Sequence, residues 1–298
     1  MCGSLKRFKG TNTKEGKMID FLALYTLKGV SVKLLKETKS LKVTINGTNC
    51  SGKFDWKVVR NLRQILNWSH QHLEVESIII DNKFNEFNGH DLEQFEGQES
   101  SDVLNYFKEY QELLSQMLKS PQYLILDMGK EYSSTLLDFA LACDFRVKAN
   151  DCLLVSEIHE NCLLPTNVLM TIGSHYYGQA FVRDLCLNHS PVKNQAWLEQ
   201  VTHESYQNET ESDVILKKAL NLNLKLSAVS RIQTKAMLFS EIENQLNYSF
   251  QTSLEYLNAS LISGEFFSNI SGLYERANPR EIRTFTMHEE KSSQLRSV

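Results

Sequence analysis

Apolar residues recur along the chain at two spacings, which predict an alternation of strands and helices. Two short apolar runs, Val30–Leu35 and Leu41–Ile45, flank a polar turn and predict a β-hairpin. From about Asp55 to His72 apolar residues return at helical spacing, and Asp55 is a suitable N-cap for the expected helix. The run Ser77–Asp81 is apolar enough for a buried strand. This part of the chain is typical of an α/β protein.

The alternation continues through a central stretch, Tyr123–Glu157. An amphipathic helix, Asp102–Lys119, precedes the stretch and ends before Pro121. The stretch begins with an apolar strand at Leu124–Met128, and a polar turn then leads to an apolar helix over Thr135–Cys143. A helix that is apolar nearly all round is typical of a domain interior. The central stretch is therefore expected to be a unit of the core.

Beyond the central stretch the pattern becomes mostly helical. Loops and a short helix are expected over Leu163–Val182, and residues 193–203 also have a helical pattern. Asp184–Leu187 fits either a short strand or a continuation of the preceding helix. Residues 212–263 predict nearly continuous helix with one or two breaks, and Gly264 is expected to end it.

Composition narrows the class of protein. The chain has 298 residues, of which 42% are hydrophobic, enough for one large domain or two ordinary ones. A net charge of −4, with Lys and Arg spread throughout, offers no basic face for nucleic acid. Neither a long apolar run nor a signal peptide is evident, so a cytoplasmic protein without a membrane span is expected. Six cysteines without C-x-x-C spacing predict reduced core residues and no metal site.

Two acids in the central stretch are candidates for acid–base chemistry. Asp138 lies within the apolar helix, where an unpaired carboxylate is so costly that it must find partners or hold its proton. Glu157 follows the apolar run Cys152–Val155, where a strand gives way to a loop. Carboxylates from neighbouring elements can form an acid–base pair. Each acid also has a structural interpretation: amides at the start of the helix can satisfy Asp138, and solvent can surround Glu157.

Several segments, in the same order, resemble motifs of the crotonase superfamily, the enoyl-CoA hydratase/isomerase family. FNGHDL, at Phe87–Leu92, is similar to F-x-A-G-x-D-L. SPQYLILDMGKEYSSTLLDFALACDFRVKA, at Ser120–Ala149, resembles the segment with the Gly-Gly-Gly turn and the motif C-D-x-R. LLVSE, which ends at Glu157, is similar to F-x-x-P-E, and LYERANPRE, at Leu273–Glu281, is similar to F-x-x-K-R-x-P. The resemblance covers about Val30 to Arg280.

The resemblance implies an α/β fold, a crotonase-like spiral of repeated ββα units with a helical C-terminal region. The corresponding division is an N-terminal extension (1–28), a spiral core (29–205), a helical region (206–280) and a polar tail (281–298). It also implies an acyl-CoA substrate, with coenzyme A as part of the substrate and no separate cofactor. Proteins of the family usually form trimers or dimers of trimers, so a homotrimer or hexamer is expected.

The same resemblance assigns roles to individual residues. The main-chain N–H groups of His90 and Thr135 would form an oxyanion hole for an enolate, and losing one such donor typically costs about 3 kcal/mol of barrier. Only the main chain of His90 is expected to act. Glu157 would be the principal acid or base and Asp138 its assistant, while Asn88, Gly89 and Asp91 would lie in the substrate-binding loop. Asp91 is also expected to cap the short segment after it.

The sequence departs from the motifs at the turn that supplies the second N–H donor. Ser133-Ser134-Thr135 stands in place of Gly-Gly-Gly, and the β-branched Thr135 side chain occupies space that glycine leaves open. Ser133 or Ser134 is a suitable N-cap for the helix that follows. Two functions remain open: an acyl-CoA hydratase or isomerase, with thioester hydrolysis or fatty-acid signal synthesis as variants, and a non-catalytic crotonase-fold binding or assembly module. The observation that distinguishes them is whether the space between His90 and Thr135 is open or filled.

Overall fold

The computed structural model describes residue 27 and residues 29–46, 52–155, 168–187, 191–264 and 266–268. The predictions for the polar tail and for Glu157 fall outside these ranges, as does all but residue 27 of the N-terminal extension.

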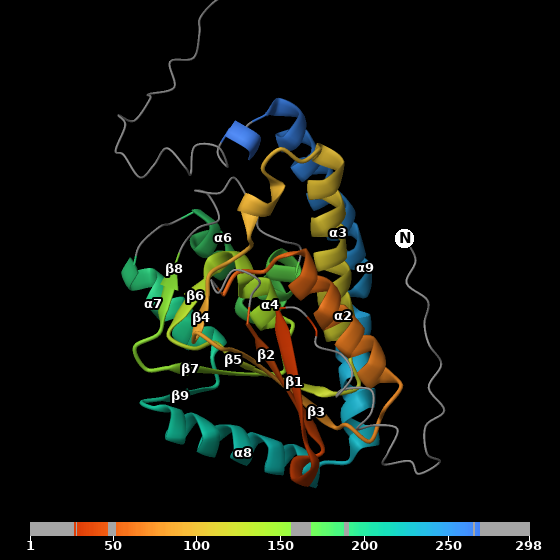
Figure 1. Ribbon diagram of the computed structural model, residues 1–298, viewed down its shortest axis with the longest axis vertical. Helices are drawn as coiled ribbons and strands as arrows, with labels where there is room; N and C mark the ends of the chain where they lie inside the picture. The colour runs from red at the N-terminus through yellow and green to blue at the C-terminus, as the bar shows by residue number, and fades with distance from the viewer. Residues whose placement is uncertain are drawn as a thin grey trace, which may run out of the picture.

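Two sheets organise the described part of the chain (Figure 1). Within the described residues, the larger sheet has six strands in the order β1 (Val30–Leu35), β2 (Ser40–Ile45), β3 (Ser77–Asn82), β5 (Tyr123–Asp127), β7 (Phe145–Ala149) and β9 (Glu204–Tyr206). β1 and β2 form the predicted antiparallel hairpin, and the later pairings in this sheet are parallel. A smaller parallel sheet joins β4 (Glu86–Phe87), β6 (Glu131–Ser133) and β8 (Leu153–Val155).

From β3 to β8, strands of the larger sheet alternate along the chain with strands of the smaller sheet. β3 leads into β4, β5 into β6 and β7 into β8. Gly129 makes the corner between β5 and β6: its φ is +70°, and a Cβ atom there would lie 2.3 Å from the carbonyl oxygen of Asn85. A helix follows β4 and another follows β6, so the predicted spiral of ββα units is confirmed.

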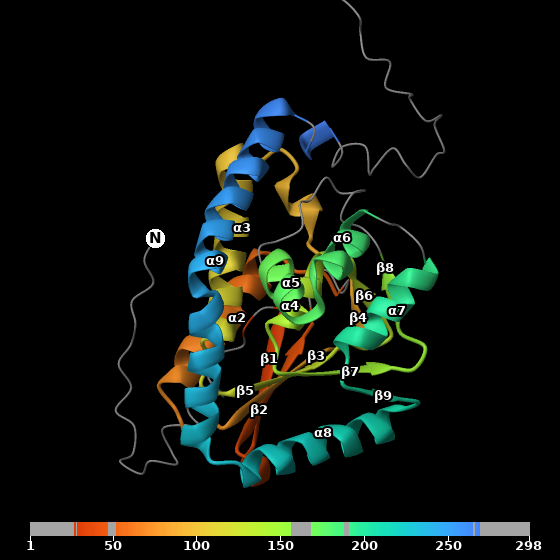
Figure 2. The same ribbon diagram turned by 180° about the vertical axis from the view of Figure 1, so that it is seen from behind.

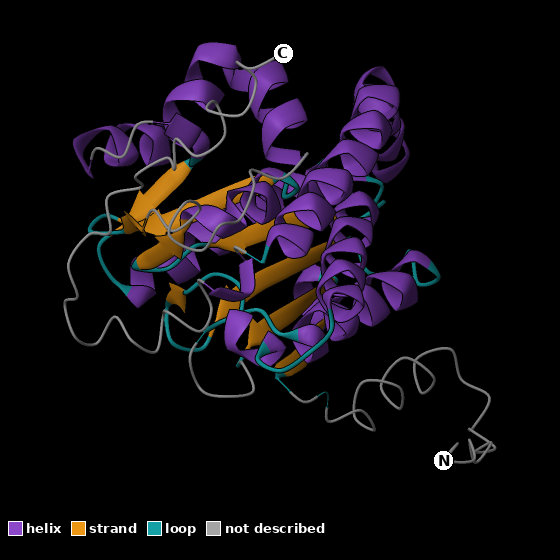
Figure 3. Ribbon diagram, turned by 90° about the horizontal axis from the view of Figure 1, so that it is seen from above, coloured by secondary structure: helices purple, strands orange, loops and turns teal. Residues whose placement is uncertain are grey.

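Helices surround the strands (Figure 3). In chain order they are α2 (Trp56–His70), α3 (Ser100–Leu118), α4 (Leu137–Leu141), α5 (Ser174–Tyr177), α6 (Gln179–Leu187), α7 (Pro191–Val201), α8 (Glu209–Lys225) and α9 (Ala228–Ser263). Asp55 caps α2 as predicted, since its Oδ1 accepts a hydrogen bond of 2.8 Å from the N–H of Val58. α3 packs between α2 and the long helix α9, whereas α8 lies against β9 (Figures 1 and 2).

The short helix α4 lies at the centre of the molecule, and all of its residues are buried. Its C-terminal carbonyl groups are satisfied by a side chain from the following strand: Nη1 of Arg146 donates to the carbonyl oxygens of Ala140 and Cys143. Nε of Arg146 donates to the carbonyl oxygen of Val201, which ties α7 to the same point. Arg146 therefore fixes the end of α4 against β7 and α7.

Most of the predicted elements are confirmed, and the errors concern short elements. β6 lies where a polar turn was expected, and neither β4 nor β9 was predicted. The expected helix over Thr135–Cys143 is a 3-10 turn, Ser134–Leu136, followed by the five-residue α4. Asp184–Leu187 continues α6, and Gly264 ends α9 with φ +77°. None of the helices in the described part of the chain is both long enough and apolar enough to cross a membrane.

Candidate active site

Three of the predicted site residues meet at the start of α4. Thr135 lies in the 3-10 turn before the helix, and Asp138 lies in its first turn. His90 comes from the loop after β4, and its ring lies within hydrogen-bonding reach of the main chain of Thr135. Glu157, the second predicted acid, lies outside the described residues.

The N–H group of Thr135, one of the two predicted oxyanion donors, has a partner within the protein. It donates a hydrogen bond of 3.2 Å to the hydroxyl of Ser133, which is the N-cap of the 3-10 turn. The Ser133 hydroxyl also lies 2.8 Å from the hydroxyl of Thr135, and both residues are buried. Ser133 therefore caps the 3-10 turn rather than the helix α4 for which the cap was expected, and this cap uses the N–H that an oxyanion would need.

The second predicted donor, the N–H group of His90, is arranged differently. Phe54 pairs with this loop through the carbonyl oxygen of Gly89 at 2.8 Å and the N–H of Asp91 at 2.9 Å. In such a parallel pairing the N–H of the middle residue, His90, is turned away from the partner strand. Within the described residues it donates to no acceptor.

The side chain of His90 is part of the core, although only its main chain was expected to matter. The ring is 6% exposed, and its Nδ1 shares a hydrogen bond of 2.9 Å with the hydroxyl of Tyr106. Burial lowers the pKa of His90 to about 3, and the hydrogen bond to the main chain of Thr135 opposes this shift only in part. The imidazole is therefore neutral at physiological pH and fills the space beside Thr135.

Asp138 is 1% exposed, and its carboxyl group accepts hydrogen bonds from one donor on α3 and one on α4 itself. Its Oδ1 accepts hydrogen bonds from the hydroxyl of Tyr110, at 2.7 Å, and from the N–H of Phe139, at 2.6 Å. Burial, followed by the charge of Asp138, raises the pKa of Tyr110 well above its ordinary value, so this hydroxyl remains a donor. The structural interpretation, in which amides at the start of the helix satisfy the carboxyl group, is supported by the Phe139 contact.

Aromatic rings pack against both residues that donate hydrogen bonds to Asp138. The ring of Phe54 makes an edge contact with that of Phe139 at 5.0 Å, and the rings of His90 and Tyr110 meet edge-on at 4.6 Å. Phe54, Tyr110 and Phe139 have no exposed surface. A cavity beside the end of α4 and another beside α8 are lined by neither Thr135 nor Asp138.

Two of the residues predicted to form the substrate-binding loop, Asn88 and Gly89, have roles in the backbone structure of that loop. The N–H of Asn88 donates to the carbonyl oxygen of Gly52 at 3.3 Å, and Gly89 has φ +77°. Asp91 is buried, which raises its pKa. It occupies the N-cap position of the 3-10 turn Leu92–Phe95, but its side chain makes no capping hydrogen bond, so the expected cap is wrong.

Sequence reasoning missed two tyrosines that shape this site, Tyr106 and Tyr110. Both lie in the amphipathic helix predicted over Asp102–Lys119, which is α3 in the structure. The available signal was the buried acid itself, because Asp138 requires a donor and a buried Tyr hydroxyl requires an acceptor. Nothing in the sequence indicates that the two are paired, since they are 28 positions apart.

Comparisons with known proteins give a consistent result for the fold. No protein-family model matches the sequence, and no curated protein matches it. An enoyl-CoA hydratase/isomerase from Pseudoalteromonas atlantica T6c is similar in structure, with a TM-score of 0.72, 16% identity and coverage of 86% of this chain and 100% of that one. An enoyl-CoA hydratase from Bacillus halodurans is similar with a TM-score of 0.69 and 17% identity, over 82% of this chain and 99% of that one. A putative polyketide biosynthesis enoyl-CoA hydratase from Bacillus subtilis is similar with a TM-score of 0.69 and 14% identity, over 85% of this chain and 100% of that one.

These likenesses define the class of structure. Over almost the full length of each solved structure, the chain follows the architecture of the enoyl-CoA hydratase/isomerase proteins. The protein therefore has the crotonase fold, as the sequence motifs predicted. The TM-scores of 0.69–0.72 establish the fold, whereas identities of 14–17% leave the chemistry to be argued from the site.

Proposed function

We propose that this protein is a non-catalytic crotonase-fold binding module in which the position of the thioester site is closed by the protein's own side chains. One observation carries the proposal: the hydroxyl of Ser133 accepts the hydrogen bond that the N–H of Thr135 would give to an oxyanion. The imidazole of His90 adds to the closure, because it is buried against the same main chain.

The buried acid supports the same conclusion. A general acid or base must reach the proton that it transfers, directly or through one water. Oδ1 of Asp138 is instead held by Tyr110 and Phe139, and the residue is 1% exposed. A substrate would have to displace the Ser133 hydroxyl from Thr135 and also open the aromatic packing around Asp138.

Crotonyl-CoA tests this proposal. The purified full-length protein would be titrated calorimetrically with crotonyl-CoA, and loss of the enoyl absorbance would be followed in parallel. We expect no turnover above that of Asp138→Asn and Glu157→Gln. Turnover in the wild type that disappears in either variant would overturn the proposal.

The second candidate is an acyl-CoA-processing enzyme, hydratase- or isomerase-like, and one specific observation favours it. The N–H of His90 is turned away from Phe54 and, among the described residues, donates to no acceptor, as an oxyanion donor requires. In this candidate Glu157 would be the principal acid or base, Asp138 would assist, and the substrate would be an acyl-CoA bound to a homotrimer or hexamer. Binding of crotonyl-CoA without turnover would favour a different thioester reaction, such as hydrolysis.

A further inference from the structure

A cavity of about 380 Å³ lies at the end of α4 opposite to Thr135. It is enclosed by the C-terminal end of α4, the π-helical turn Leu169–Gly173, α5 and α9. Its volume falls within the ~300–1,000 Å³ range of small-molecule sites. None of the residues assigned to the thioester site lines it.

Most of the cavity wall is apolar. The residues that form this wall come from α3, α4, the π-helical turn and α9: Leu118, Leu141, Ile172, Leu238, Phe239 and Ile242. Tyr176 and Leu238 are 53% and 45% exposed, so they lie at the side of the cavity that faces solvent. Such a wall favours a ligand with an apolar body.

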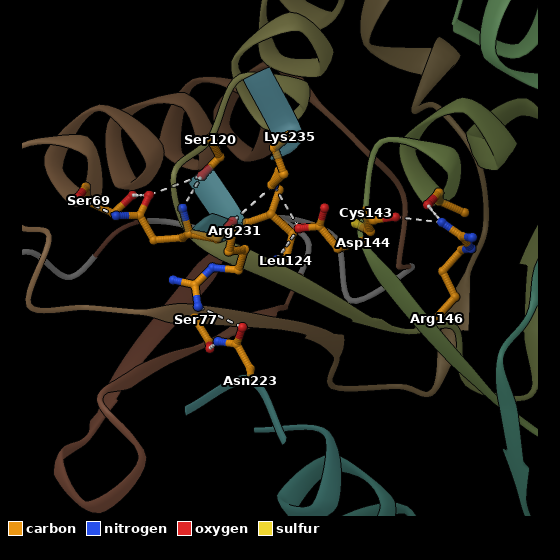
Figure 4. Close-up of polar contacts among 12 residues, drawn as sticks. Ser69, Ser77, Ser120, Leu124, Cys143, Asp144, Arg146, Asn223, Arg231 and Lys235 are labelled. Atoms are coloured by element: carbon orange, nitrogen blue, oxygen red, sulfur yellow. Dashed lines mark hydrogen bonds and ion pairs between the residues drawn. The ribbon is translucent and has the colours of Figure 1, made fainter. Parts of the chain in front are cut away.

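The polar part of the wall carries two cations and one anion. Lys235 of α9 donates to the carbonyl oxygen of Gln122 at 3.0 Å and to Oδ2 of Asp144 at 2.7 Å, and Arg146 lies on the far side of Asp144 (Figure 4). Lys235 and Arg146 are largely buried, with exposed fractions of 15% for the Lys235 side chain and 7% for Arg146. The described residues that line the cavity include two cations, Lys235 and Arg146, and one acid, Asp144. This part of the wall therefore has a net charge of +1.

The donors on this wall outnumber the acceptors. An ammonium group has three hydrogens and a guanidinium group five. Lys235 has two hydrogen-bond acceptors among the described residues, and Nη2 of Arg146 has only a long contact of 3.5 Å with the hydroxyl of Tyr177. Donors left over beside a net positive charge favour an anionic ligand.

His203 adds a further donor. Its Nδ1 accepts a hydrogen bond of 3.1 Å from the N–H of Arg146, so the neutral ring carries its proton on Nε2. Burial, with the charge of Arg146, lowers the pKa of His203 to about 4, which keeps the ring neutral at physiological pH. Because a neutral His203 adds no charge, the wall complements a group with a single negative charge.

We propose that this cavity is a binding site for a small amphipathic carboxylate. The carboxylate would lie against Lys235, Nη2 of Arg146 and the hydroxyl of Tyr177, and its apolar body would lie against Ile172 and Phe239. A carboxylate fits better than a phosphate monoester, because its single charge matches the net charge of the wall and its chain suits the apolar part. The proposal does not depend on whether the thioester site is active.

Octanoate is a suitable probe, with octan-1-ol as the uncharged comparison of equal chain length. Calorimetric titration of the full-length protein with octanoate is expected to give saturable binding at one site, and octan-1-ol is expected to bind at least ~10-fold more weakly, since it lacks the charge-assisted hydrogen bonds. No binding of octanoate, or equal binding of the two, would overturn the proposal.

Two neighbouring positions on α9 provide a matched pair of variants. Leu238 lines the cavity, whereas Met237 is 70% exposed and does not. Leu238→Trp should fill the cavity and abolish octanoate binding, and Met237→Trp should leave it unchanged, with thermal unfolding confirming that both proteins fold. Octanoate binding that survives Leu238→Trp, or that Met237→Trp also removes, would place the ligand elsewhere.

Tyr177→Phe tests the position of the carboxylate while the ring is kept. Loss of one hydrogen bond to a charged group should weaken octanoate binding ~10-fold. Octan-1-ol binding should change less, and an equal loss for both ligands would contradict the assigned position.

Discussion

The two ends of α4 are built in different ways. At its start, Asp138 and its neighbours are packed among aromatic rings, and Ser133 satisfies the N–H of Thr135. At its end, charged residues line a cavity that retains uncommitted donors. In the proposed account, side chains fill the position of the thioester site at the start of α4, and a cavity at the other end of the same helix binds a ligand.

The largest expected effect tests how tightly the start of α4 is packed. Phe139→Ala should lower the free energy of unfolding by about 3–5 kcal/mol, because it removes a fully buried ring from its contact with Phe54. Leu238→Ala, at the cavity mouth, is the control and should change the free energy of unfolding by no more than about 0.5 kcal/mol. Urea unfolding measures both, and similar values for the two variants would remove the contrast.

The hydrogen bond to Asp138 can be isolated with two matched tyrosines. Tyr110→Phe should lower the free energy of unfolding by about 2 kcal/mol, since it removes a hydrogen-bond donor from a buried carboxyl group. Tyr132→Phe removes a hydroxyl that donates to the carbonyl oxygen of Leu136 at 2.8 Å, and it should cost about 1 kcal/mol. Both tyrosines are fully buried, so a larger loss for Tyr132→Phe in urea unfolding would contradict the role given to Asp138.

The buried His90 predicts a pH dependence of stability. Its pKa is about 3 in the folded protein and near 6.5 when unfolded, so below pH 6.5 the unfolded state binds a proton that the folded state does not. The stability that His90 contributes is present above pH ~6.5 and is lost as the pH falls, by about 2 kcal/mol between pH 7.5 and 5.

His90→Phe provides the comparison for this pH dependence. It should be less stable at pH 7.5, because it loses the hydrogen bond with Tyr106, but its urea midpoint should fall less on acidification. An unchanged pH dependence in His90→Phe would show that another group is responsible.

The smallest expected effect concerns the cap at Ser133. Ser133→Ala should lower the free energy of unfolding by about 1 kcal/mol, the usual cost of an N-cap hydroxyl. It should not produce crotonyl-CoA turnover, because Asp138 remains enclosed by Tyr110 and Phe139. Turnover in this variant would show that the Ser133 hydroxyl alone closes the site.

The sequence predicted the longer elements well because their apolar periodicity is strong. α2, α3 and β3 were placed within a few residues, and Asp55 was recognised as the cap of α2. β6 was missed because Glu131 and Ser133 are polar, and because the strand is stabilised by pairing with β4 and β8 rather than by local propensity.

The candidate site was predictable only in part. The motifs placed His90, Thr135 and Asp138 at one point of the fold, and the structure brings them together. The pairing of Tyr110 with Asp138 and the burial of the His90 ring could not be predicted, because each depends on how α3 packs over α4. The cavity at the other end of α4 was missed for the same reason, since its wall combines residues from segments as distant as Leu118 and Ile242.

Backbone amide chemical shifts would test the contrast between the two ends of α4 most directly. Two-dimensional NMR spectra of the full-length protein would be recorded during parallel titrations with octanoate and crotonyl-CoA. We expect octanoate to shift the amides of Ala142 and Cys143 and to leave those of Thr135 and Asp138 in place, and crotonyl-CoA to shift neither pair. Saturable shifts at Thr135 and His90 with crotonyl-CoA, without change at Ala142, would contradict the account.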